Sequence, residues 1–164
     1  MRIRRHLLLL AAILPLALAA GCSKAPPAQA DSGPPQAHHH HPPHGGTPVV
    51  LGNEAYHLEL VLDAAAGRLQ AYVLDAEMEN FVRTAAPSLT ISAIVDGRPR
   101  ELVLAAVANT QTGETVGDTS LFEAQAGWLK GASGFDGELR SLTIRGATFT
   151  GVKFNFPRGN DTDG

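Results

Sequence analysis

The chain has 164 residues, which allows one domain of ordinary size with some sequence left over. Lys and Arg number 13 and Asp and Glu 16, and Arg2, Arg4 and Arg5 lie at the very start, so the rest of the chain carries a net charge of −6 with neutral histidines. An acidic chain without a basic cluster excludes a nucleic-acid partner, and a single cysteine excludes an internal disulfide framework and a Cys-based zinc finger.

Residues 1–21 have the organisation of a lipoprotein signal peptide. A basic start precedes an uncharged run from Leu7 to Ala20, which is shorter than the about 20 residues that a transmembrane helix needs. The run ends in Leu18-Ala19-Ala20-Gly21-Cys22, which resembles a bacterial lipobox whose cysteine receives a diacylglycerol and a further acyl chain such as palmitate. The alternative is a simple secretory signal with an incidental cysteine. We expect lipidation at Cys22 and, because Ser23 follows it, anchoring in the cell envelope of a Gram-negative bacterium, at the outer membrane facing the periplasm.

Residues 22–46 form a stretch rich in proline and histidine. No Val, Ile, Leu, Met, Phe, Tyr or Trp occurs from Ser23 to Pro48, and prolines come in pairs. A segment without apolar side chains cannot form a core, and paired prolines favour extended conformations. We therefore expect a disordered tether between the lipid anchor and the folded part.

The folded part is expected at 47–158. Stretches in which apolar residues recur at every second position are separated there by residues that favour turns. Three hairpins are predicted: strands at 56–62 and 69–74 joined through Gly67, strands at 89–95 and 101–107 joined by Asp96-Gly97, and strands at 139–144 and 148–156 joined by Arg145-Gly146. The register of 69–74 is open by one residue, because that strand is apolar on both faces. The alternation in the first strand places Tyr56, Leu58, Leu60 and Leu62 inward.

Residues 119–131 are compatible with two readings. Leu121, Ala124 and Trp128 fit helical spacing, whereas Gly127 and Gly131 favour a short strand near 120–124 followed by one helical turn. The short strands and their turn spacing predict an all-β fold, a single antiparallel β-sandwich with immunoglobulin-like topology as the leading expectation. Residues 159–164 are expected to be a disordered acidic tail.

Most of the histidines cluster in the predicted tether. Five of the seven are His38, His39, His40, His41 and His44. Neutral imidazole is a common ligand of Zn²⁺, Cu²⁺ and Ni²⁺, and a flexible chain can wrap several rings around one ion. The alternative is a polar low-complexity spacer whose histidines only keep it soluble.

The folded part contains one histidine, His57, with Glu59 two residues later on the same strand face. The pair completes a metal site with His44 if the Gly45-Gly46 hinge folds the tether back onto the strand. The alternative is that both are ordinary solvent-facing strand positions. Glu77, Met78 and Glu79, in the loop after the first hairpin, are further candidate ligands.

Residues 42–80 resemble a known family. Pro43-His44-Gly45-Gly46, the strand His57-Leu58-Glu59-Leu60 and the strand Leu69 to Asp75 are similar to a region near the N-terminus of some heavy-metal efflux adaptor proteins, and to small bacterial lipoproteins with a His-rich stalk before the same His-Gly-Gly. The resemblance implies a small β region in which His44 and His57 are candidate ligands. The coiled-coil hairpin and lipoyl-like domain of an adaptor have no counterpart here, so we do not expect a complete adaptor.

Enzyme motifs are missing from the sequence, since it contains no G-x-S-x-G, H-E-x-x-H, P-loop or G-x-G-x-x-G. We expect a non-enzymatic envelope lipoprotein, anchored in the membrane through Cys22, that binds or buffers a divalent transition metal (Cu²⁺, Zn²⁺ or Ni²⁺) in connection with an efflux system. Two other classes stay open. One is a protein-interaction module on a spacer that docks on an envelope partner, and the other is a carbohydrate- or small-ligand-binding domain, for which Trp128 is the suggestive aromatic.

Overall fold

A computed structural model describes residues 41–161, so residues 1–40, with the predicted signal peptide, the predicted lipidation site Cys22 and His38 to His40, and residues 162–164 lie outside the described range. The elements are β1 (Thr47–Leu51), β2 (Tyr56–Asp63), β3 (Arg68–Leu74), β4 (Ser88–Val95), β5 (Arg98–Ala106), β6 (Leu121–Gln125), the 3₁₀ helix η1 (Gly127–Leu129), β7 (Phe135–Ile144) and β8 (Ala147–Phe156). All paired strands are antiparallel, which confirms the all-β antiparallel prediction. The strand and helical turn expected within 119–131 are present as β6 and η1.

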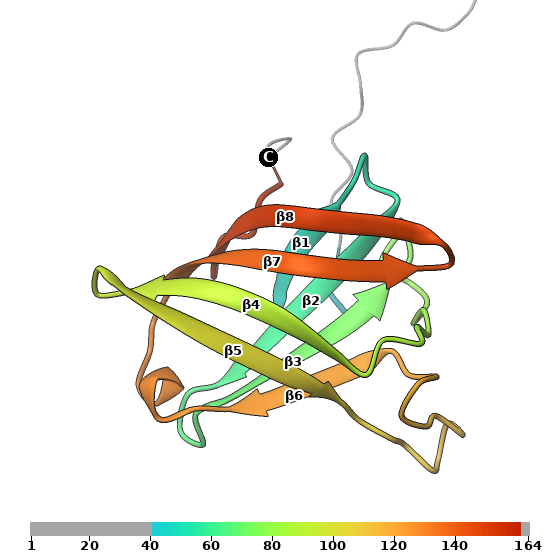
Figure 1. Ribbon diagram of the computed structural model, residues 1–164, viewed down its shortest axis with the longest axis horizontal. Helices are drawn as coiled ribbons and strands as arrows, with labels where there is room; N and C mark the ends of the chain where they lie inside the picture. Colours follow the sequence, from blue (N-terminus) through green and yellow to red (C-terminus); the bar gives the residue numbers. More distant parts are fainter. Residues whose placement is uncertain (1–40, 162–164) are drawn as a thin grey trace, which may run out of the picture. The chain divides into compact units, whose positions relative to one another are not determined.

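The eight strands form one sheet in the order β1-β2-β3-β6-β5-β4-β7-β8. Only Ala105↔Glu123 and Ala106↔Phe122 join β5 to β6, so two four-stranded halves face each other across the core (Figure 1). The immunoglobulin-like topology, with two separate sheets, is not adopted. The reason is that β6 pairs along its length with β3 and, through Phe122 and Glu123, with the last two residues of β5, which makes the sheet continuous and curls it towards a barrel.

Two predicted hairpins depend on residues with positive φ in both central turn positions. Asp96 and Gly97 have φ of 50° and 73°, and Arg145 and Gly146 have φ of 48° and 87°. Two consecutive positive φ angles are the mark of a turn whose twist matches that of the flanking strands. The turns between β4 and β5 and between β7 and β8 therefore lie where the sequence predicts them.

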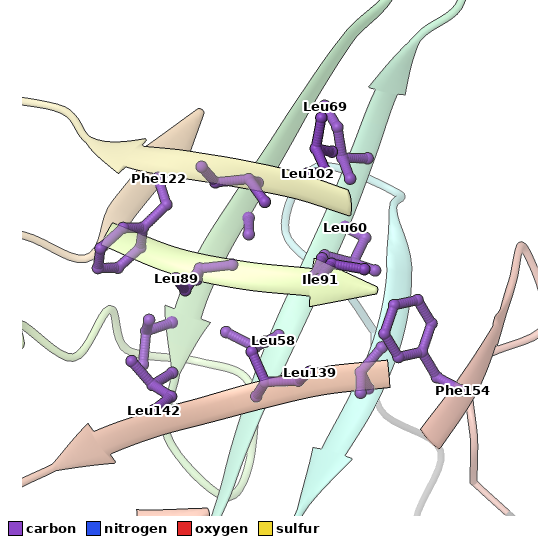
Figure 2. Close-up of a cluster of buried hydrophobic side chains, with 14 of the residues drawn as sticks. Leu58, Leu60, Leu69, Leu89, Ile91, Leu102, Phe122, Leu139, Leu142 and Phe154 are labelled. Atoms are coloured by element: carbon purple, nitrogen blue, oxygen red, sulfur yellow. The ribbon is translucent and has the colours of Figure 1, made fainter. Parts of the chain in front are cut away.

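The core is built from the inward faces of both halves. Leu58 and Leu60 of β2 point inward as predicted, and Figure 2 shows them beside Ile91 of β4 and Leu139 of β7. Phe122, fully buried, lies at the junction where β6 meets β5. The opposite face of each strand is therefore left for solvent or for covering segments.

The two edge strands, β1 and β8, are brought together by the segment that follows β8. Asn160 accepts a hydrogen bond from the Val50 amide through Oδ1 at 2.7 Å and donates to the Val50 carbonyl through Nδ2 at 3.2 Å. Its side-chain amide thus takes the place of a strand neighbour for β1. Thr47 donates to the Pro157 carbonyl in the same seam. Residues 159 and 160 belong to the folded part, which the sequence boundary at 158 places too early.

Asn160→Ala is expected to weaken the contact between β1 and the segment after β8. The substitution removes both hydrogen bonds to Val50 and leaves the amide and carbonyl of Val50 without their protein partner. The expected loss in the free energy of unfolding is about 1–3 kcal/mol, measured by urea denaturation. Asn53→Ala, at an exposed position in the β1–β2 turn, is the control and is expected to change stability by less than about 0.5 kcal/mol. Equal stability of the two variants would contradict the role of Asn160.

A buried carboxylate organises the loop between β5 and β6. Glu114 accepts hydrogen bonds from the Ser120 amide at 2.8 Å, the Ser120 hydroxyl at 2.6 Å and the Thr112 hydroxyl at 2.7 Å. Burial alone raises the pKa of Glu114, but these hydrogen bonds and the nearby Arg83 outweigh it, so that the pKa is lowered. The folded state therefore favours the ionised carboxylate.

Because the pKa of Glu114 is lower in the folded state, its contribution to stability is fully present above the ordinary value of 4.5 and is lost as the pH falls through the folded-state value. Glu114→Gln is expected to be less stable than the natural protein at pH 7, by about 1–3 kcal/mol. The difference is expected to shrink in urea titrations at pH values below 4.5. Glu101→Gln, at an exposed position, is the matched control, and a pH-independent difference for Glu114→Gln would refute the assignment.

Candidate functional site

The outward face of β2 carries the two polar residues singled out in the sequence, and neither is open to solvent. His57 and Glu59 alternate with the inward Leu58 and Leu60, yet both are fully buried. Glu59 is covered by residues 44–46, which fold back over the strand. The alternative that both residues face solvent is therefore wrong, and for Glu59 the cover is the segment that precedes β1.

Glu59 is the centre of this enclosure. Oε1 accepts hydrogen bonds from the backbone amides of His44 at 2.7 Å and Gly46 at 2.9 Å, and Oε2 lies 2.7 Å from Nδ1 of His44. The two amides flank Gly45, whose φ of +67° points them towards the same oxygen. Backbone amides that converge in this way form a concave anion site, which here holds a side chain of the same protein.

Each residue of the His-Gly-Gly motif has a separate physical role. Pro42 accepts a hydrogen bond from the Gly45 amide at 2.9 Å, which closes a turn, and Gly45 then adopts the left-handed conformation that glycine accepts at little cost. A Cβ on Gly46 would lie 2.6 Å from the Leu60 carbonyl oxygen and 2.8 Å from Cγ of Glu59, so only glycine fits against β2. His44 supplies the side-chain donor. The predicted fold-back of the Gly45-Gly46 hinge is present.

Two aromatic rings complete the surroundings of His44. The His44 ring stacks on Tyr72 with centroids 4.0 Å apart and planes 18° apart, and the Phe81 ring lies 5.8 Å away at 44°. Tyr72 stands opposite Glu59 in the β2–β3 register, which explains why it is within reach. Burial, followed by the charges of Glu59 and Glu123, raises the pKa of Tyr72, so its hydroxyl stays protonated at neutral pH.

His44 is held on one side and open on the other. Its side chain retains 37% of its exposure, whereas that of Glu59 retains none, so the ring is reachable from solvent while its partner is not. Nδ1 lies 2.7 Å from Oε2 of Glu59, within hydrogen-bond distance of a carboxylate oxygen. Nε2 is the ring nitrogen for which no protein partner exists within residues 41–161.

His57 does not join His44. Its Nδ1 lies 3.1 Å from the carbonyl oxygen of Asp75, at the start of the loop after β3. The Asp75 carboxylate accepts hydrogen bonds from the amides of Glu79 and Asn80 and from the Asn80 side chain. These bonds outweigh burial, which alone raises the pKa of Asp75, and lower it. Met78 of this loop is buried, with a positive φ of 56°. The loop therefore covers the face of β2 beside His57.

The part of the chain from residue 41 to 161 contains no group of three His, Cys, Asp or Glu side chains placed to hold a metal ion. His41 is exposed, three residues before His44. Of the predicted ligands, the structure therefore brings together His44 and Glu59, with His57 directed to another partner. No helix between residues 41 and 161 has the length and apolar character needed to cross a bilayer.

A groove of about 760 Å³ lies on the other half of the sheet. It is lined by residues of β4, β5, β7 and β8, with Ile94 and Pro99 among the apolar ones. Ile94 keeps 49% of its exposure. Charges of both signs border the groove, namely Arg100, Glu101 and Lys153.

A scan against protein-family models and searches of curated proteins and of solved structures give no match to this chain. The parts of the site that sequence reasoning did not single out are Tyr72, Phe81 and the backbone amides that bind Glu59. A backbone amide can bind whatever the side chain is, so the sequence does not reveal these donors directly. The available signal is the pair of glycines, because Gly45 has a positive φ and Gly46 lies too close to β2 for a Cβ.

Gly46→Ala is expected to lift residues 44–46 from β2, because the added Cβ overlaps the Leu60 carbonyl oxygen. Overpacking of this kind costs about 1–3 kcal/mol, which corresponds to an increase of roughly 5- to 160-fold in the hydrogen-exchange rate of the His44 amide. NMR-detected exchange of that amide measures the effect. Gly127→Ala, where a Cβ meets nothing within 4 Å, is the control. If the His44 amide stays equally protected from exchange in Gly46→Ala, the close packing of Gly46 against β2 is not what holds residues 44–46 in place.

Proposed function

We propose that this protein is a non-enzymatic lipoprotein of the Gram-negative cell envelope, anchored through Cys22, that binds a divalent transition metal with its histidine run. The ligands in this proposal are His38 to His41 and His44. The bound metal would serve an efflux system, as the resemblance of residues 42–80 suggests. The observation that carries the proposal is the attachment of His44, the last histidine of the run, to a buried carboxylate with its ring still exposed.

The support for metal binding comes from the way that histidine ligands are held in proteins. A metal-binding histidine commonly donates its second ring N–H to a carboxylate, which fixes the ring and raises its basicity as a ligand. Glu59 and His44 have this relation, with Oε2 2.7 Å from Nδ1. Imidazole suits Zn²⁺, Cu²⁺ and Ni²⁺, and the exposed His41 lies close in sequence to supply a second ring.

The proposal gives His57 and Glu59 no direct bond to the metal. Both are fully buried, and each already contacts a group of the protein, Asp75 for His57 and residues 44–46 for Glu59. Metal ions would therefore bind at the junction of the histidine run and the folded part, on the solvent side of His44.

Isothermal titration of the untagged full chain in detergent with Zn²⁺, Cu²⁺ and Ni²⁺ tests the proposal. Because His44 is ordered before binding, the chain is expected to bind at least about tenfold more tightly than a synthetic peptide of residues 36–44. His44→Ala is expected to lose that advantage, and Ser at His38 to His41 is expected to abolish tight binding. If the natural chain binds no better than the peptide, the folded part contributes nothing to the metal site.

The groove on β4, β5, β7 and β8 favours a second candidate, an interaction module that docks on an envelope partner. Ile94 and Pro99 provide apolar surface there, with charges of both signs at its border. This candidate requires that Ser at His38 to His41 and at His44 leave the cellular function intact, and that Ile94→Asp remove it. The two sets of variants in a growth assay under metal stress distinguish the candidates.

A further inference from the structure

We infer that Nε2 of His44 is the atom that bonds the metal, and that Glu59 is a positioning residue that makes this nitrogen available. The inference rests on the proposed function and deepens it. It assigns one ligand atom and one residue outside the coordination sphere, and it concerns divalent ions that favour imidazole nitrogen, such as Zn²⁺.

The first step is the state of the imidazole ring. A neutral imidazole has one nitrogen that carries a proton and one with a free lone pair, and only the second can bond a metal. Nδ1 of His44 lies 2.7 Å from Oε2 of Glu59, so the proton resides on Nδ1. The lone pair is therefore on Nε2, at the edge of the ring away from the carboxylate.

The second step is the orientation of the ring. The His44 ring stacks on Tyr72 at 4.0 Å, and the His44 backbone is held by its amide bond to Oε1 of Glu59 at 2.7 Å. Backbone, ring plane and ring nitrogen are thus fixed by separate contacts. A ligand held in this way loses little freedom when the metal arrives, which favours binding.

The third step is the environment of Glu59. Its carboxylate has no exposure and accepts three hydrogen bonds from residues 44–46. A direct metal bond would have to displace these donors from a buried charge, which is strongly unfavourable. Glu59 therefore acts through His44 rather than on the metal.

Nuclear magnetic resonance of the ¹⁵N-labelled full chain in detergent tests the inference, with Zn²⁺ alone as the probe. Spectra at pH 8, above the ordinary range of imidazole titration, show which ring nitrogen of His44 carries the proton. We expect the proton on Nδ1 in the metal-free chain. On addition of Zn²⁺ we expect the Nε2 resonance to shift while the proton stays on Nδ1.

Three other outcomes overturn the inference in distinguishable ways. A metal-free His44 protonated on Nε2, or a metal bond at Nδ1, removes the ligand assignment and leaves metal binding in place. Shifts confined to His38 to His41 remove His44 from the site but leave binding by the histidine run. No shift at any of these five histidines overturns the proposed function together with the inference.

Glu59→Gln tests the positioning role. Loss of a carboxylate partner of this kind costs 10- to 100-fold in metal affinity, and we expect that loss for Zn²⁺ together with the loss of the Nδ1–H preference at His44. Glu101→Gln, an exposed carboxylate on the other half of the sheet, is the control that leaves both unchanged. A folded Glu59→Gln chain with unchanged Zn²⁺ affinity overturns the role of Glu59. If that variant fails to fold, the natural chain provides the test: a proton on Nδ1 of His44 supports the positioning role of Glu59, and a proton on Nε2 overturns it.

Discussion

A buried charge must be matched by donors, and Glu59 imposes this constraint on the outer face of β2. The carboxylate has no exposure, and the three hydrogen bonds that stabilise it come from His44 and Gly46. An ionised carboxylate without such partners would be strongly destabilising in this environment. The segment before β1 therefore belongs to the fold. Its docking also explains why a turn, a left-handed glycine and a second glycine without room for a Cβ occur together within the five residues 42–46.

Both ends of the described chain close the sheet with side chains where strand pairing stops. At the beginning, the carboxylate of Glu59 binds the backbone amides of His44 and Gly46, and near the end the side-chain amide of Asn160 binds both backbone polar groups of Val50. β1 has five residues and β8 ten, so the two edges cannot pair along their full length. Where β1 and β8 do not pair, polar side chains form the hydrogen bonds that a neighbouring strand would form. Fewer backbone groups at the edges of the sheet are then left unpaired.

The sequence predicts the local parts of this structure and misses the nonlocal ones. Asp96-Gly97 and Arg145-Gly146 predict their hairpins because positive φ at adjacent positions is a property of those residues in a short turn. The pairing of β6 with both β3 and β5 joins residues far apart in the chain, and no local pattern reports it. For the same reason Asn160 reads as part of an acidic tail. At the site, the sequence predicts the Gly45-Gly46 hinge and the approach of His44 to the strand face that carries Glu59. It does not predict the position of Tyr72, because the strand 69–74 is apolar on both faces and its register with β2 therefore stays open by one residue.

The position of His44 decides what the histidine run can contribute in the proposed function. A run of imidazoles on a free chain must order every ligand when an ion binds, and each ordered side chain costs free energy. His44 has already been ordered by folding, through Glu59 and Tyr72, so one ligand of the set is held at a fixed place. The other histidines precede it by three to six residues, which keeps their effective concentration at that place high. The buried carboxylate thereby links the stability of the domain to the availability of the ligand, since unfolding of residues 44–46 would remove both.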